Sequence, residues 1–152
     1  MANVYVSGII NLPVGKVWSY ARDFNGHHEW HPFIAESHIE DGLPSDRVGC
    51  VRNFKLTDGG HLRERLLSFS DLDRSFTYNI IVSPLPIRNY IARFTCKPVT
   101  EGDKTFVEWT ADFDVAETDE AQIREQVGRN TFAVGIASLA KALNANVGNP
   151  GL

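Results

Sequence analysis

Five strand patterns follow one another between residues 50 and 115, separated only by short turns. They cover residues 50–56, 61–69, 75–83, 87–97 and 105–115. The turn TDGG at 57–60 joins the first two as a hairpin, and TEGDK at 100–104 joins the last two. Because short turns connect antiparallel neighbours, this succession predicts one antiparallel sheet.

Two further strands and two short helices precede this group. Residues 4–11 and 33–40 also have strand patterns. Between them, Pro13 suits the first position of a helix, and apolar residues recur after it at helical spacing. Residues 27–31 can form one or two further turns before Pro32 ends them.

A long helix ends the predicted order. Asp119 can cap it, with Gln122 at the capping-box position, and the helix runs to about Ala145. Seven strands in one antiparallel sheet with a long helix packed on it form an α+β arrangement. We expect a single domain over residues 1–147, followed by a tail at 148–152.

Composition excludes several classes of protein. The chain has 152 residues, of which 43% are hydrophobic and 22% charged, with a net charge of −4. The basic residues are scattered, which argues against a nucleic-acid partner. The sequence contains no apolar run of about 18 residues, so we expect no integral membrane segment. Its first residues lack the pattern of a signal peptide. Cys50 and Cys96 have no CxxC neighbour, so we expect two buried free thiols in a reducing cytoplasm.

Four stretches of the chain carry a family pattern. They are LPVGKVWSYARDFNGHHEWHP (12–32), VGCVRNFKLTDGGHLRERLLSFSD (48–71), SFTYNIIVSPLPIRNY (75–90) and VEWTADFDV (107–115). They resemble the START-like, birch-pollen-allergen superfamily (SRPBCC proteins), and more closely its bacterial polyketide cyclase/dehydrase branch. Plant hormone receptors of the superfamily have a similar VGC-R strand and a similar NY strand. The resemblance implies a helix-grip fold, in which a curved sheet wraps around the long helix and encloses a cavity.

Strand alternation then predicts which side chains face that cavity. Apolar residues mark the inward face, and two tyrosines and one glutamate lie among them. An apolar wall with a few polar groups is typical of a small-molecule pocket. The candidate ligand-binding residues are His31, Phe54, Leu56, Leu62, Glu64, Leu66, Tyr78, Ile80, Tyr90, Ala92, Trp109, Ala111, Val127, Thr131 and Gly135.

Glu64 is the unusual member of this set because it is a carboxylate on a face of leucines. It can pair across the hairpin with Arg52, whose guanidinium suits a carboxylate. It can also recognise a ligand or transfer protons. The resemblance implies the ligand role, since the matching position in the hormone receptors is a pocket glutamate.

The long helix carries a stripe of small residues. Gly128, Thr131, Gly135 and Ser138 recur at steps of three and four, beside a bulky stripe of Phe132, Ile136, Leu139 and Leu143. Helix-interior glycines cost roughly 1 kcal/mol each relative to alanine, so a packing reason is expected. The small stripe either leaves room for a cavity or lets the helix pack closely on the sheet.

The segment FNGHHEWHP at 24–32 is rich in histidine. His27 and His31 are four residues apart, but the sequence HHEWH is not the HExxH zinc motif, and Pro32 disfavours a helical His31. A zinc site also needs at least three protein ligands. We therefore expect no metal, with Trp30 packed into the core, His27 and His28 solvated, and His31 at the pocket rim.

Three classes of function remain open. The first is the binding of a small hydrophobic lipid, aromatic or polyketide-like molecule, without a cofactor. The second is a cyclase/dehydrase-type enzyme, whose catalytic groups would be Glu64, Tyr78 and Tyr90. The third is a protein-partner domain that uses the sheet or the long helix as an interface. The sequence leaves homodimerisation open.

Overall fold

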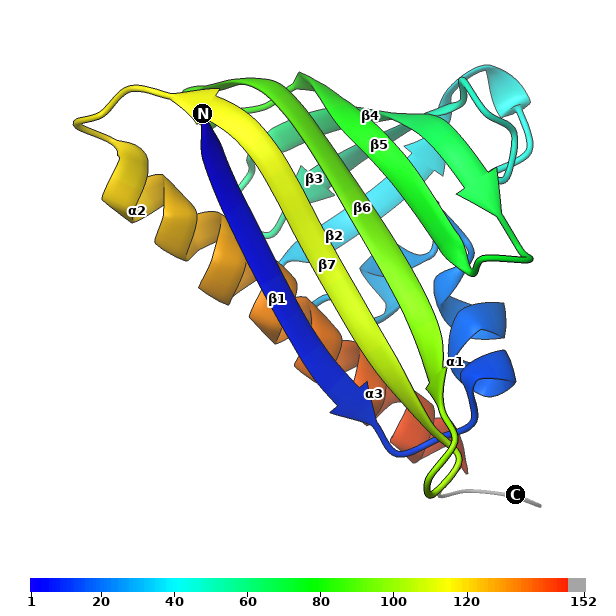
Figure 1. The fold of residues 1–152 in the computed structure, drawn as a ribbon. Helices are drawn as coiled ribbons and strands as arrows, with labels where there is room; N and C mark the ends of the chain where they lie inside the picture. The colour runs from blue at the N-terminus through cyan, green and yellow to red at the C-terminus, as the bar shows by residue number, and fades with distance from the viewer. Residues whose placement is uncertain (148–152) are drawn as a thin grey trace.

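The computed structural model describes residues 1–147, and the predicted tail lies outside them. It contains one seven-stranded antiparallel sheet in the order β1-β7-β6-β5-β4-β3-β2, as Figure 1 shows. The strands are β1 (Ala2–Ile10), β2 (Ile34–Ile39), β3 (Val51–Leu56), β4 (His61–Ser70), β5 (Ser75–Val82), β6 (Ile87–Val99) and β7 (Lys104–Val115). The α+β helix-grip prediction is confirmed.

The predicted helices are present, and one 3-10 turn, η2, lies where the sequence predicts the end of a strand and a loop. The helical elements are α1 (Val14–Ala21), the 3-10 turns η1 (His27–Glu29) and η2 (Glu40–Gly42), α2 (Glu120–Glu125), the π-helical η3 (Gln126–Ala133) and α3 (Val134–Val147). The last three form one continuous rod, called here the C-terminal helix (Figure 1). Asp119 is its N-cap residue, but the carboxylate makes no capping hydrogen bond, so the predicted capping box is wrong.

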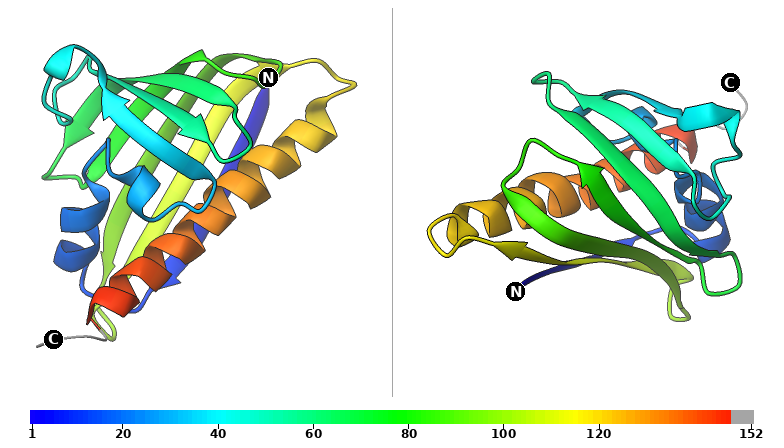
Figure 2. Two further views of the ribbon diagram at one scale, coloured as in Figure 1. Left: turned by 180° about the vertical axis from the view of Figure 1, so that it is seen from behind. Right: turned by 90° about the horizontal axis from the view of Figure 1, so that it is seen from above.

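The C-terminal helix lies along the concave face of the curved sheet (Figure 2). It packs closely against β1, where two glycines allow the approach. A Cβ on Gly128 would lie 3.1 Å from Val4 Cγ1, and a Cβ on Gly8 would lie 3.1 Å from Ile136 Cγ2. Close packing at this edge strand fixes the helix while strands β3 to β6 curve around it.

The core between sheet and helix is rich in aromatic rings. The alternation in β7 is as predicted, since Val107, Trp109, Ala111 and Phe113 are all buried. Trp109 stacks on Phe132 of the C-terminal helix, with ring centroids 4.6 Å apart. The bulky helix stripe is buried throughout its length, so the helix presents the predicted face to the sheet.

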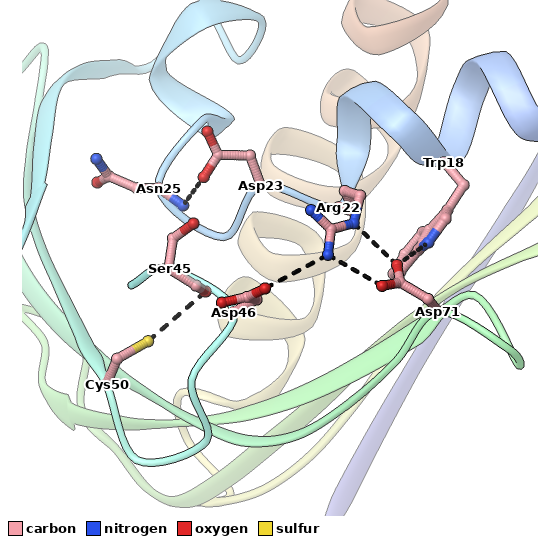
Figure 3. A network of polar contacts seen from close by, with 8 residues as sticks. All are labelled: Trp18, Arg22, Asp23, Asn25, Ser45, Asp46, Cys50 and Asp71. Atoms are coloured by element: carbon pink, nitrogen blue, oxygen red, sulfur yellow. Dashed lines mark hydrogen bonds and ion pairs between the residues drawn. The ribbon is translucent and has the colours of Figure 1, made fainter. Parts of the chain in front are cut away.

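A polar network ties α1 to the sheet (Figure 3). Arg22 donates two hydrogen bonds to Asp71, from Nε at 2.8 Å and from Nη2 at 3.0 Å. The indole Nε1 of Trp18 donates to the same carboxylate at 2.8 Å, and Asp46 lies 3.6 Å from Arg22 Nη2. These contacts link the end of α1 to the β4–β5 turn and to the loop before β3, and so hold the following segment, which includes Phe24.

Both cysteines are free and buried, as expected. Cys50 Sγ donates to the carbonyl of Ser45 at 3.7 Å, also visible in Figure 3. Burial raises the pKa of the Cys96 thiol to about 12, so this thiol is protonated and unreactive at neutral pH. Within residues 1–147, no helix is long and apolar enough to cross a membrane.

Candidate functional site

A pocket of about 520 Å³ lies between strands β3 to β7 and the first half of the C-terminal helix. Its lining residues are His27, His31, Phe33, Ile34, Arg52, Phe54, Leu56, Thr57, Asp58, Leu62, Glu64, Tyr78, Ile80, Pro84, Leu85, Ile87, Tyr90, Trp109, Gln126, Val127, Asn130 and Thr131. Most of the predicted ligand-binding residues are in this set. Whether they hold a ligand stays a prediction.

One end of the pocket opens to solvent and the other is buried. The residues at the open end are exposed and come from loops and the helix surface: Phe33, Thr57, Asp58, Pro84 and Asn130. The residues at the inner end are buried and include the charged and phenolic groups: His27, Arg52, Glu64, Tyr78 and Tyr90. A molecule entering from the open end would therefore pass an apolar wall before it reached these polar groups.

Arg52 and Glu64 form a buried ion pair at the inner end. They lie directly opposite each other in the β3–β4 register, and their side chains are only 4% and 6% exposed. Arg52 Nη2 and Nε lie 2.6 Å and 2.8 Å from Glu64 Oε1. Burial raises the pKa of the Glu64 carboxyl, and the nearby Arg52 opposes that rise.

The guanidinium of Arg52 has further contacts besides the one with Glu64. Its Nη1 donates to the carbonyl of Phe24 at 2.8 Å, and its Cζ lies 4.0 Å from the centre of the Phe24 ring and 4.7 Å from that of Tyr78. Cation–π contacts of this kind stabilise a desolvated guanidinium. The predicted pairing of Glu64 with Arg52 is confirmed. Glu64 also lines the pocket, and its role toward a ligand stays a prediction.

The two tyrosines stand beside this ion pair. Trp109 Nε1 donates to the hydroxyl of Tyr78 at 3.0 Å, and the rings of Tyr78 and Tyr90 lie 6.3 Å apart. Burial raises the pKa of both phenols, with the negative charge of Glu64 acting in the same direction. Both are therefore neutral at physiological pH and offer hydroxyl groups to the pocket.

His31 joins the wall of the pocket to the C-terminal helix. Its Nε2 lies 2.8 Å from the carbonyl oxygen of Thr131, and its Nδ1 accepts the backbone N–H of Phe33 at 3.2 Å. These partners fix the neutral tautomer with the proton on Nε2. Burial lowers the pKa of His31, with Arg52 adding to the effect and the bond to Thr131 opposing it. His31 is buried in the wall rather than at the rim.

The prediction that the His27 side chain is solvated is wrong. His27 is only 5% exposed, and its ring packs edge-on against Phe54 with centroids 4.6 Å apart. Among the described residues, neither ring nitrogen has a hydrogen-bond partner. Burial and the positive charge of Arg52 lower its pKa well below the usual range. His28 is half-buried and its Nδ1 lies 2.9 Å from the carbonyl of Asn25.

With this geometry established, comparisons with known proteins identify the family. Residues 1–144 match the profile of the family described as polyketide cyclase / dehydrase and lipid transport. The chain belongs to this family. No curated protein matches it.

Several solved structures have a similar fold. A protein from Thermobifida fusca has a TM-score of 0.85 at 28% identity, covering 95% of both chains. An uncharacterised protein from Bacillus thuringiensis has a TM-score of 0.83 at 28% identity, covering 93% of this chain and 98% of its own. A norcoclaurine synthase variant from Thalictrum flavum, bound to a transition-state analogue, has a TM-score of 0.74 at 12% identity, with 96% of each chain covered. This last likeness concerns the fold alone.

In this member of the family, four predicted pocket residues lie elsewhere. Leu66, Ala92 and Ala111 are buried on the predicted face but do not line the pocket. Gly135 does not line it because the helix packs closely there: a Cβ would lie 2.8 Å from Trp109 Cζ3. Close packing, not an open stripe, explains this glycine.

Other pocket residues escaped the sequence prediction. Phe33, Thr57, Pro84 and Leu85 belong to loops, where strand alternation gives no direction. Gln126 and Asn130 belong to the π-helical segment, whose wider turn changes the spacing of residues on one face. Trp30 packs partly buried against the core, as predicted. Within residues 1–147, no group of three His, Cys, Asp or Glu side chains could hold a metal ion.

Proposed function

We propose that the protein binds a small, largely apolar molecule in the pocket, with a polar group of that molecule directed at the inner end. The observation that carries the proposal is a pocket of about 520 Å³ with an apolar wall and a buried Arg52–Glu64 pair. Small-molecule sites are usually of about 300–1,000 Å³ and combine apolar walls with a few polar groups.

The proposed ligand-binding residues are those predicted residues that line the pocket. They are His31, Phe54, Leu56, Leu62, Glu64, Tyr78, Ile80, Tyr90, Trp109, Val127 and Thr131. The apolar members would contribute to affinity by burying ligand surface, at roughly 25 cal/mol per Å². Glu64 and the two tyrosines would orient the ligand, because unpaired polar groups are costly inside an apolar wall.

A second candidate is a cyclase- or dehydratase-type reaction, and the environment of Glu64 favours it. Burial raises the pKa of this carboxyl, and a carboxyl whose pKa is closer to neutral is a better proton-transfer group. Tyr78 and Tyr90 would then provide hydroxyl groups beside the substrate. Glu64→Gln separates the two candidates: a carrier would lose affinity, whereas an enzyme would lose about 10²-fold or more in turnover and keep its binding.

A fluorescence titration with N-phenyl-1-naphthylamine, a neutral apolar probe, tests the binding proposal. Ile80 lines the pocket, while the next residue, Ile81, is more exposed and points to the opposite face of β5. We expect saturable one-to-one binding by the natural protein, at least tenfold weaker binding by Ile80→Trp, and unchanged binding by Ile81→Trp. Equal effects of the two substitutions, or no saturable binding by the natural protein, would contradict the proposal.

A further inference from the structure

His27 is a polar side chain that the folded protein does not use for its own hydrogen bonding. It is 95% buried, and neither Nδ1 nor Nε2 has a partner among residues 1–147. A buried donor or acceptor left unpaired costs about 1–3 kcal/mol, and an apolar side chain of similar size would avoid that cost. The fold alone therefore gives no reason for a histidine at this position.

The ring of His27 lies on the wall of the pocket, near the buried ion pair. It lines the pocket together with Phe54 and Arg52, and its ring rests against Phe54. Phe54 and Arg52 are two residues apart in β3 and therefore share one face of the sheet. Arg52 in turn binds Glu64. His27 thus belongs to the polar inner end, where the two charges of the pair balance each other.

The chemistry of the wall indicates what His27 could bind. The nearby guanidinium disfavours a second positive charge, so the imidazole is neutral and offers one N–H donor and one nitrogen acceptor. A carboxylate ligand would place an uncompensated negative charge beside Glu64, and an amine would place an uncompensated positive charge beside Arg52. Buried charges without a partner are strongly disfavoured. A hydroxyl group is neutral and can both donate and accept.

We propose that His27 is a ligand-binding residue that hydrogen-bonds a neutral hydroxyl group, such as a phenol or an enol, on an otherwise apolar molecule held in the pocket. This inference rests on the proposed binding function. It adds a recognition residue and restricts the ligands to neutral molecules with a hydroxyl at the end that enters first.

A competition experiment with three probes that share the naphthalene ring tests this. The probes are 2-naphthol, 2-methylnaphthalene, which replaces the hydroxyl by a methyl group, and 2-naphthoate, which carries a carboxylate. Each probe is titrated as a competitor of bound N-phenyl-1-naphthylamine, with the natural protein and with His27→Leu, at pH 7.5. His28→Leu is the matched control, because His28 is outside the pocket lining and bonds to a backbone carbonyl.

The natural protein should prefer 2-naphthol to both other probes. His27→Leu should reduce the preference for 2-naphthol over 2-methylnaphthalene by about tenfold, equivalent to about 1.4 kcal/mol. His28→Leu should keep the natural preference. Should His27→Leu fail to fold, nitrogen NMR of the natural protein decides: 2-naphthol, but not 2-methylnaphthalene, should shift the ring nitrogens of His27.

Several results would overturn the inference, and they distinguish its failure from that of the proposed function. Suppose that 2-naphthol binds, that His27→Leu keeps the natural preference for it over 2-methylnaphthalene, and that the NMR signals of the His27 ring nitrogens do not shift. His27 is then not a recognition residue, and the binding function stands. If N-phenyl-1-naphthylamine itself does not bind, the proposed function fails and the inference fails with it. If it binds but neither 2-naphthol nor 2-methylnaphthalene displaces it, the inference fails and the binding function stands. Preferential binding of 2-naphthoate would also overturn the restriction to neutral ligands.

Discussion

The Nε2–H of His31 donates a 2.8 Å hydrogen bond to the carbonyl of Thr131, and this bond connects the η1–β2 segment to the C-terminal helix across one wall of the pocket. The other ring nitrogen of His31 accepts the N–H of Phe33, a residue at the pocket mouth. Because both nitrogens are engaged, adding a proton to the ring would place an N–H against the N–H of Phe33. Neutral His31 therefore supports both the helix position and the mouth.

The first prediction concerns pH. The pKa of His31, and more strongly that of His27, is below the ordinary value of 6.5, so the folded state binds fewer protons than the unfolded state. These two groups therefore contribute their full stabilisation above about pH 6.5. The free energy of unfolding then decreases as the pH drops through their pKa values in the folded state. Urea unfolding between pH 7.5 and 5.5 measures this loss.

His31→Gln should show a smaller loss of stability over the same pH range, because the amide can still donate to Thr131 but does not titrate. The exposed His38 provides the control, and His38→Gln should keep the pH dependence of the natural protein. An identical pH dependence in His31→Gln would contradict the prediction for His31.

The second prediction concerns the ion pair. Glu64→Ala should lower the free energy of unfolding by about 3–5 kcal/mol, because it leaves the guanidinium of Arg52 buried without its carboxylate. The double variant Arg52→Met with Glu64→Leu should be more stable than either single variant, since no charge is then left unpaired. Urea unfolding of the natural protein, Arg52→Met, Glu64→Leu and the double variant gives the coupling energy, and simple additivity of the two substitutions would disprove a buried pair.

The third prediction concerns His27. Replacing it with leucine should raise the free energy of unfolding by about 1 kcal/mol at pH 7.5, because the substitution removes an unpaired buried polar ring. His28→Leu should bring no such gain, since it removes a side chain that bonds to the Asn25 carbonyl. A clear loss of stability in His27→Leu would indicate a structural role. A gain would show that the fold does not require a histidine at this position, as expected for a residue retained for binding.

The burial of His27 also shows where sequence reasoning reaches its limit. Strand alternation gave the right inward face from β3 to β7 because the period of two depends only on the local backbone. His27 lies in a 3-10 turn of three residues, too short for any periodicity to define a face. Its burial depends on the sheet curving around that turn, and on the contacts of Phe54 and Arg52, which come from distant parts of the chain.

Gly135 shows a second limit. The spacing of small residues along the helix correctly indicated a special surface, but it could not distinguish space for a ligand from close contact with a side chain. That distinction depends on how far Trp109 and His31 reach toward the helix. The π-helical segment η3 had no signal in the sequence pattern, so the contributions of Gln126 and Asn130 were missed.

The fourth prediction follows from that close contact. Gly135→Ala should lower the free energy of unfolding by about 1–3 kcal/mol through overpacking, although alanine favours a helix by roughly 1 kcal/mol. Its Cβ would lie 2.8 Å from Trp109 Cζ3 and 3.0 Å from His31 Cδ2. The matched control is Gly15→Ala in α1, where a Cβ meets nothing within 4 Å, and here thermal unfolding should show a gain. Equal gains at both sites would contradict the packing described.

The three tryptophans allow the most direct test of ligand binding in the pocket. In a nitrogen–proton NMR spectrum each gives one indole signal, and only Trp109 lines the pocket, while the indole of Trp18 is bonded to Asp71 outside it. Titration with N-phenyl-1-naphthylamine should move the Trp109 signal in a saturable manner and leave the Trp18 signal in place. An unmoved Trp109 signal at saturating probe, or equal movement of both signals, would contradict binding inside the pocket.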